Sequence, residues 1–130
     1  MSEQAILCVD DEEMVLNSLE MQLKDHFGDK YIYEFAENAE EALEIIEQLC
    51  EEGTDVLIIV SDWLMPGLKG DEFLIKVHEK FPKIVKVLLT GQADSEAVER
   101  AIAQANLHRC IYKPWNAKEL IETIQSGMSE

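Results

Sequence analysis

Hydrophobic positions along this 130-residue chain fall into two alternating patterns. Short apolar or aromatic runs with few polar interruptions recur along the chain, as in strands that are covered on both faces. They occupy residues 5–9, 31–36, 56–60, 84–90 and 110–112. After each run, apolar residues recur at helical spacing, which predicts an amphipathic helix. The pattern therefore predicts five strand–helix units.

Strands that are joined by helical crossovers run parallel, and right-handed crossovers place helices on both faces of the sheet. The predicted fold is α/β, a doubly wound parallel sheet of five strands with five helices, in one domain over residues 1–130. Asn38 with Glu41, and Asn116 with Glu119, have the spacing of capping boxes at helix starts. Periodicity leaves the strand order open. The flavodoxin-like order 2-1-3-4-5 is favoured because it brings together the candidate site residues.

The composition narrows the possible partners. The 27 acidic and 11 basic residues give a net charge of −16, which disfavours direct binding to nucleic acid because phosphates are repelled. The apolar runs are too short to cross a membrane, and the first residues lack the pattern of a secretory signal, so we expect a cytoplasmic protein. The three cysteines are far apart, which favours free thiols over a disulfide or a zinc site.

Residues with useful chemistry come directly after four of the predicted strands. They are Asp10 and Asp11, Asp62, Thr90 and Lys113. In the favoured strand order these ends are neighbours at the crevice where ligands bind. Three clustered carboxylates repel one another and therefore favour a hard cation such as Mg²⁺ (or Mn²⁺). A hydroxyl and an ammonium group beside them would hold a phosphate, which predicts phosphoryl transfer, for which an aspartate can be the nucleophile.

Taken singly, each of these residues has an ordinary structural explanation. Asp10 could cap the first helix, and Asp62 could belong to the turn before Pro66. Thr90 and Lys113 could be a satisfied strand-end hydroxyl and a surface lysine. The functional interpretation depends on their conjunction, because four separate strand ends each supply the residue type that the chemistry needs.

Four segments of the sequence resemble one known family. The segments "ILCVDDE", "IIVSDWLMPGLKG", "LLTG" and "IYKP" occur in the order and at the spacing of the receiver domain of two-component response regulators. The resemblance covers essentially the whole chain. It implies that Asp62 accepts a phosphoryl group from the phosphohistidine of a sensor histidine kinase or a phosphotransfer protein and later loses it by hydrolysis. Such a domain is a signalling module that catalyses only its own phosphorylation and dephosphorylation, not an enzyme acting on other substrates.

The resemblance also assigns roles to the other residues. The metal ligands would be Asp10, Asp11, Asp62 and the carbonyl of Leu64. Thr90 would meet the phosphoryl group when the domain switches, and Lys113 would pair with it. Pro114 would follow a cis peptide bond. The fourth helix, fifth strand and fifth helix would form the face for an output domain or partner protein, with Arg100, Ala103 and Arg109 on or near it.

The sequence departs from the family pattern at a few positions. Cys110 replaces the usual aromatic switch residue. Tyr112 lies on the same strand face, where plain packing is the simpler interpretation. Gly91 stands where alanine is common, which should loosen the following loop. The side chains of Leu64 and Gln92 occupy positions that influence acyl-phosphate lifetime, so we expect Leu64→Asn to change the hydrolysis rate and leave Mg²⁺ affinity nearly unaltered.

Rival functions fit the sequence less well. A haloacid-dehalogenase-like phosphatase needs a second aspartate two residues after the nucleophile, where this chain has Leu64. A flavodoxin-like binding module would need a Ser/Thr/Gly-rich phosphate loop after the first strand, and Asp10 and Asp11 would repel an anionic cofactor there. A receiver-like scaffold that is never phosphorylated would not need the full set of site residues.

Overall fold

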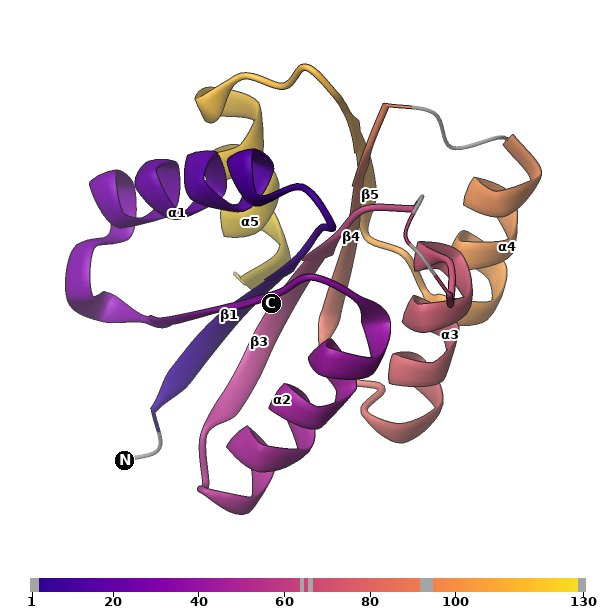
Figure 1. Ribbon diagram of the computed structural model, residues 1–130, viewed down its shortest axis with the longest axis horizontal. Coiled ribbons are helices and arrows are strands. Elements are labelled where there is room, and N and C mark those ends of the chain that lie inside the picture. Colours follow the sequence, from indigo (N-terminus) through magenta and orange to yellow (C-terminus); the bar gives the residue numbers. More distant parts are fainter. Residues whose placement is uncertain (1–2, 64, 66, 92–94, 129–130) are drawn as a thin grey trace.

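The predicted strands form one parallel sheet. The computed structural model describes residues 3–63, 65, 67–91 and 95–128. The strands are β1 (Gln4–Val9), β2 (Ile32–Ala36), β3 (Asp55–Ser61), β4 (Val85–Thr90) and β5 (Arg109–Tyr112). All neighbouring strands are parallel, in the order β2-β1-β3-β4-β5 (Figure 1). The strand order chosen from the positions of the site residues is confirmed.

Helices follow the strands and cover both faces of the sheet. They are α1 (Glu13–Phe27), α2 (Ala39–Glu51), α3 (Gly70–Lys80), α4 (Ser95–Ala105) and α5 (Ala117–Met128), with a short 3-10 helix, η1 (Gly28–Lys30), after α1. Figure 1 shows α1 and α5 on one face of the sheet and α2, α3 and α4 on the other. The α/β class, the five crossover helices and the doubly wound arrangement agree with the prediction.

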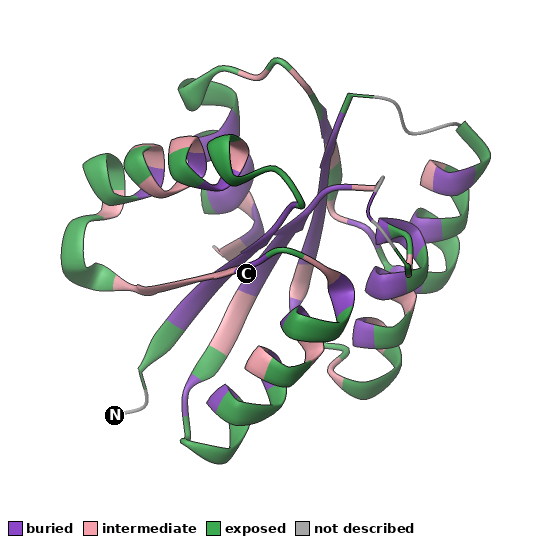
Figure 2. Ribbon diagram, in the orientation of Figure 1, coloured by how far each residue is buried: buried purple, intermediate pink, exposed green. Residues whose placement is uncertain are grey.

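Two hydrophobic clusters, one on each face, explain why the strands are apolar throughout. Ile6 and Cys8 of β1 pack in the cluster under α1 and α5, whereas Leu7 and Val9 pack in the cluster under α2, α3 and α4. Successive residues of a strand point to opposite faces, so a strand that is covered on both sides favours apolar side chains at nearly every position. Figure 2 shows this burial along the central strands, with the outer helix faces exposed.

The helix starts that the sequence indicates are largely confirmed. The Asn38 carboxamide oxygen accepts a hydrogen bond from the N–H of Glu41 at 2.8 Å, and Asn116 does the same for Glu119 at 2.7 Å. The Glu41 carboxylate returns to the N–H of Glu37, one residue outside the position that a capping box uses. Both asparagines therefore cap their helices and relieve the unpaired N–H groups of the first turn.

All three cysteines lie in the described part of the chain and are free thiols, as expected. Cys8 is buried, Cys110 is half-buried and Cys50 is exposed. Within the described ranges, the helices are too short or too polar for any of them to span a lipid bilayer.

Candidate functional site

The pairing of β1 with β3 brings two aspartates side by side. Val9 pairs with Ser61 at the carboxyl ends of these strands, and the N–H of Asp62 donates to the Val9 carbonyl at 2.9 Å. Asp10 and Asp62 follow directly on neighbouring strands. Carboxylate oxygens of Asp10, Asp11 and Asp62 all lie within 4.8 Å of one another. This acidic cluster is the set of carboxylates that the sequence predicts at the crevice.

Asp10 and Asp11 differ in their surroundings. Asp10 is 1% exposed, and its carboxylate accepts a hydrogen bond from the N–H of Glu12 at 2.8 Å. The first helix begins at Glu13, and Glu12 occupies the N-cap position without a side-chain cap. The alternative in which Asp10 is the helix cap is therefore wrong, because its carboxylate closes a turn before the helix. Asp11 is exposed, so it can approach a hydrated cation at lower desolvation cost.

Lys113 joins the acidic cluster from the end of β5. Its ammonium nitrogen lies 2.8 Å from an oxygen of Asp10 and 3.4 Å from an oxygen of Asp62. The N–H of Lys113 donates to the carbonyl of Thr90 at 2.9 Å, which ties together the ends of β4 and β5. The peptide bond between Lys113 and Pro114 is cis, as the family resemblance implies.

Burial and charge act against each other in this cluster. Burial raises the pKa of Asp10, and the charge of Asp62 adds to the rise, while the bonds from Lys113 and from the N–H of Glu12 oppose it. Burial lowers the pKa of Lys113, but its hydrogen bonds and charge interactions with Asp10 and Asp62 outweigh that effect, so the pKa is raised overall. Lys113 is therefore cationic at neutral pH, and its one positive charge pairs with Asp10 and Asp62 but not with Asp11, so the three clustered carboxylates outnumber the cation. The excess negative charge and the oxygen donors suit a hard divalent cation.

Of the other predicted site residues, only Thr90 lies within the part of the chain that the structure describes. Thr90 is buried at the end of β4 and pairs with Tyr112 of β5, so it lies next to the strand that ends in Lys113. Leu64, the predicted backbone ligand, and Gln92 lie outside the described residues.

Cys110, at the position of the usual aromatic switch residue, contacts Tyr112. Burial raises the pKa of the half-buried Cys110 thiol, and a hydrogen bond from Tyr112 lowers it in part. Tyr112 is 54% exposed, so the interpretation of Tyr112 as a simple packing residue is wrong. The expectation that these two side chains share one face of β5 is confirmed by this contact.

Gly70 is a residue of the site whose role the sequence does not reveal. Its N–H donates to the carbonyl of Trp63 at 2.8 Å, which folds the loop after β3 back on itself. A Cβ atom at Gly70 would overlap the carbonyl oxygen of Asp62 and lie 2.7 Å from the Cα atom of Trp63. Only glycine allows α3 to begin this close to the backbone of the site. The glycine in "LKGDE" is the only sequence signal for this close approach.

Asp71 and Arg100 are further residues that the sequence does not connect to the site. Asp71 is 1% exposed, and its carboxylate bonds to Arg100 and to the indole N–H of Trp63. An aspartate in the first turn of a helix is ordinarily exposed and interacts with the helix dipole. Its burial depends on the packing of α3 against α4, for which the sequence carries no local signal.

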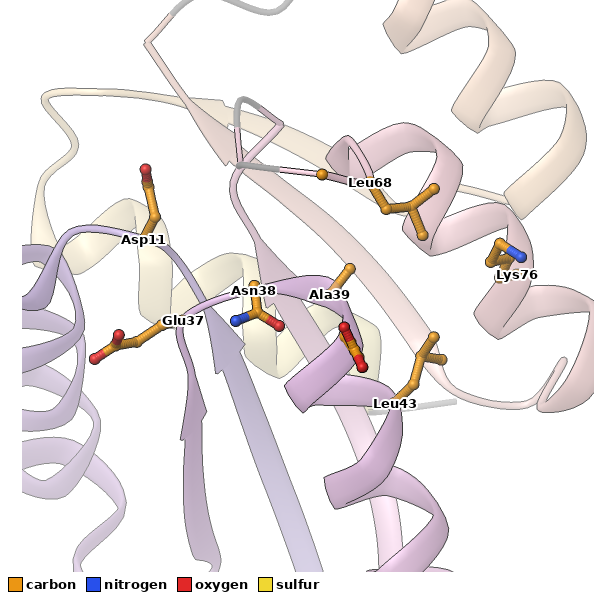
Figure 3. A pocket seen from close by; sticks show the side chains of 9 residues that line it. Asp11, Glu37, Asn38, Ala39, Leu43, Leu68 and Lys76 are labelled. Carbon is orange, nitrogen blue, oxygen red and sulfur yellow. The ribbon is translucent and has the colours of Figure 1, made fainter.

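An open cavity of about 760 Å³ lies beside the acidic cluster (Figure 3). Its lining comes from the loops after β1 and β2, from α2, and from α3 with the loop before it. The lining residues are Asp11, Glu37, Asn38, Ala39, Glu40, Leu43, Gly67, Leu68 and Lys76. Asp11 belongs both to this lining and to the acidic cluster, so the cavity adjoins the site and gives solvent access to its exposed carboxylate.

Known proteins share the sequence pattern and the fold. The family described as response regulator receiver domain matches residues 6–125. The hydrogenase transcriptional regulatory protein HoxA of Cupriavidus necator is 32% identical over 95% of this chain, which corresponds to 24% of HoxA. The sensor kinase CckA of Brucella abortus is 30% identical over 96% of this chain and 12% of its own length. The chain thus spans a quarter or less of these two relatives.

Solved structures agree with the sequence comparison. The signal receiver domain of an HD domain-containing protein from Pseudomonas fluorescens has a TM-score of 0.83 and 29% identity, covering 96% of this chain and 94% of that chain. A CheY-like response regulator receiver domain protein from Methanospirillum hungatei has the same TM-score at 30% identity, covering 98% and 94%. The family match over residues 6–125 is decisive: the chain belongs to the response regulator receiver domain family and is a receiver of two-component signalling.

Proposed function

We propose that this receiver accepts a phosphoryl group on Asp62, with Mg²⁺ (or Mn²⁺) held by the acidic cluster. The observation that carries the proposal is the grouping of three carboxylates within 4.8 Å with the ammonium group of Lys113 beside two of them. The donor would be the phosphohistidine of a sensor histidine kinase or of a phosphotransfer protein. We expect the receiver to act in the cytoplasm, as the sequence pattern predicts.

The geometry supports different roles for the two carboxylate oxygens of Asp62, because they have different partners. One oxygen accepts a hydrogen bond from the N–H of Trp63 at 2.8 Å, and the other faces Lys113 at 3.4 Å. In the reaction, a carboxylate oxygen of Asp62 forms the new O–P bond while the P–N bond to the donor imidazole breaks. The ammonium group of Lys113 can then pair with a phosphoryl oxygen, and the buried hydroxyl of Thr90 can move toward it.

Asp10, Asp11 and Asp62 would hold the cation, and the carbonyl of Leu64 is the further ligand that the family resemblance implies. Bound Mg²⁺ would neutralise the negative charge that gathers between the carboxylates and the incoming phosphoryl group. Because Asp10 is buried and Asp11 exposed, we expect Asp10 to fix the position of the cation and Asp11 to contact it through water.

The outcome of phosphorylation would be a changed affinity for an output domain or partner protein. Arg100, Ala103 and Arg109 are exposed on α4 and β5, as the proposed face of α4, β5 and α5 requires. Ile102 and Tyr112 are also more than half exposed on the same elements. The chain would catalyse only its own phosphorylation and dephosphorylation.

The test is to incubate the protein with Mg²⁺ and a small acyl phosphate, and to measure the intact mass. We expect one added phosphoryl group in the wild type, none without a divalent cation, and none in Asp62→Asn. Asp55→Asn is a matched control, because Asp55 is an exposed aspartate at the opposite end of the same strand and should leave labelling unchanged. Label that persists on Asp62→Asn would refute the assignment.

A further inference from the structure

The carboxylate of Asp71 connects the loop after β3 with helix α4. One of its oxygens accepts a hydrogen bond from the indole N–H of Trp63 at 3.0 Å. The other accepts from the guanidinium of Arg100 at 2.6 Å, across 29 residues of sequence. The side chain of Asp71 is 2% exposed, so these partners replace the water that a surface aspartate would have.

Trp63 connects Asp71 to the proposed phosphorylation site. Its backbone N–H donates to a carboxylate oxygen of Asp62 at 2.8 Å, and its indole N–H donates to Asp71. The ammonium group of Lys69 lies 5.1 Å from the centre of the Trp63 ring, which adds a second constraint on the ring position. A continuous series of hydrogen bonds therefore runs from Asp62 through Trp63 and Asp71 to Arg100.

The far end of this series is accessible to solvent. The side chain of Arg100 is 45% exposed, although its guanidinium pairs with a buried carboxylate. Helices α3 and α4, which carry Asp71 and Arg100, lie side by side on one face of the sheet (Figure 1). An acidic group of a partner that attracted Arg100 would leave the Asp71 carboxylate without its cation, and burial would make that state unfavourable.

We propose that Asp71 is a positioning residue that couples the state of Asp62 to helix α4 through Trp63 and Arg100. Phosphorylation of Asp62 would change the acceptor available to the Trp63 N–H, and the ring would carry this change to Asp71 and Arg100. By linkage, a partner that binds at Arg100 would shift the free energy of phosphorylating Asp62 by the same amount as phosphorylation shifts the binding free energy of that partner. This inference rests on the proposed phosphorylation of Asp62.

The experiment uses the full chain with Trp115→Phe, so that Trp63 is the only tryptophan and its fluorescence reports this series. Arg100→Gln, Asp71→Asn and the double variant are compared for their rate of labelling by acetyl phosphate at saturating Mg²⁺. We expect each single variant to change the maximal rate about 5-fold, with little effect on the donor concentration at half-maximal rate. The double variant should match the single variants, because both changes break the same series.

Controls separate coupling from general loss of structure. Lys80→Gln is the matched control, since Lys80 and Glu47 form an exposed ion pair at 2.9 Å that also joins two helices, and it should leave both rate and Trp63 emission unchanged. Arg100→Lys keeps a cation near Asp71 and should retain most of the wild-type rate. If Asp71→Asn fails to fold, Arg100→Gln still tests the proposal, because its side chain is partly on the surface.

The outcomes distinguish this inference from the proposed function. Equal rates and equal Trp63 emission in Arg100→Gln and the wild type would overturn the coupling, as would additive effects in the double variant. If the wild type takes up no phosphoryl group, the proposed function fails, and the coupling is judged by titration with Mg²⁺ alone. The Trp63 emission change on Mg²⁺ binding must then differ between Arg100→Gln and the wild type, and an identical titration would refute the coupling.

Discussion

At the carboxyl end of the sheet, Lys113 lies within ion-pair distance of Asp10 and Asp62, whereas at the amino end the buried Lys86 is surrounded by neutral groups. The ammonium group of Lys86 donates to the carbonyl of Ile84 at 2.6 Å and contacts Nδ1 of His78 at 3.0 Å. Among the described residues no carboxylate forms an ion pair with it.

The difference indicates which end of the sheet could hold a cation. At the carboxyl end, Lys113 pairs with two of three clustered carboxylates, so their negative charge exceeds its single positive charge. At the amino end, dipoles of the protein satisfy Lys86, and its burial lowers the pKa of the ammonium group. A buried charge that is unbalanced indicates a site for an incoming ion, whereas a buried charge that is hydrogen-bonded by neutral groups is consistent with a structural role.

The largest expected effect is on the free energy of unfolding, and it compares how rigid the surroundings of a glycine are at the two ends of the sheet. Gly70→Ala would place a Cβ atom against the backbone of Asp62, which cannot move without displacing the site. Gly127, near the amino end, would place a Cβ atom 2.8 Å from a methyl group of Val85 and 3.3 Å from one of Ile58, and these side chains can adjust. We expect Gly70→Ala to lower the free energy of unfolding by about 3 kcal/mol, and Gly127→Ala by less than about 1 kcal/mol.

Chemical denaturation monitored by circular dichroism measures both losses. Gly91→Ala is the control at the carboxyl end, because its Cβ atom would lie 3.9 Å from that of Lys113, an ordinary contact. It should be neutral or stabilise the protein by about 0.5 kcal/mol by restricting the unfolded chain. At Gly70 the added Cβ atom would meet backbone atoms, and at Gly127 it would meet side chains. Similar losses of unfolding free energy in the two variants would contradict the expectation that this difference matters.

The next effect tests the charge imbalance itself. Mg²⁺ at about 100 times its dissociation constant should stabilise the wild type by about 2.7 kcal/mol, because only the folded chain assembles the acidic cluster. Asp10→Asn should be more stable than the wild type without metal, since burial raises the pKa of Asp10 and thus disfavours its charged form at neutral pH. The same variant should gain much less from Mg²⁺.

The sign of the Asp10 effect follows from linkage. The folded protein holds the Asp10 proton more tightly than the unfolded chain, whose ordinary pKa is 3.8, so stability falls as pH rises through the window above that value. Thermal unfolding with and without Mg²⁺ measures the effect, with Asp55→Asn as the control for a lost exposed carboxylate. A metal-free Asp10→Asn protein that melts below the wild type would show that the pairing with Lys113 outweighs the burial of Asp10.

The sequence predicts the sheet and most of the acidic cluster because both follow from local rules. Continuous apolar runs between amphipathic segments require strands covered on both faces. Once Val9 and Ser61 pair at the ends of neighbouring strands, Asp10 and Asp62 must lie together. The strand order came from the chemistry of the strand ends, and the observed order agrees with that choice.

The sequence does not predict the contacts of the buried charges away from the strand ends, and the reason is physical. Asp71 and Arg100 lie on different helices 29 residues apart, and their contact depends on how α3 and α4 pack. Lys86 interrupts an apolar strand, but its sequence neighbours do not show that carbonyl groups and His78 surround its end. Periodicity identifies which face of an element is apolar, and it does not identify which polar groups meet across two elements.

The smallest expected effect concerns the amino end. Burial lowers the pKa of Lys86 in the folded protein below its ordinary value of 10.5. At pH values between the folded-state pKa and 10.5, the unfolded chain therefore holds the proton more tightly than the folded protein. The stability contributed by Lys86 is therefore complete above pH 10.5 and is lost as pH falls through the pKa of the folded state. Lys86→Met lacks this dependence, and the wild type should gain stability relative to it as pH rises towards 10.5, by at most about 1.4 kcal/mol per pH unit.

Urea unfolding of both proteins at several pH values between neutrality and 10.5 measures this difference. Other titrating groups, such as cysteines and tyrosines, contribute equally to the two proteins and cancel in the comparison. Lys80→Met serves as the control, because Lys80 is exposed and its pair with Glu47 lies on the surface, so the same comparison should give no slope. A flat difference for Lys86→Met would mean that Lys86 keeps its proton in the folded state as readily as in the unfolded chain. Hydrogen bonds to neutral groups would then fully offset the free-energy cost of burying the Lys86 charge. The two ends of the sheet would then differ only in how many charged groups lie there.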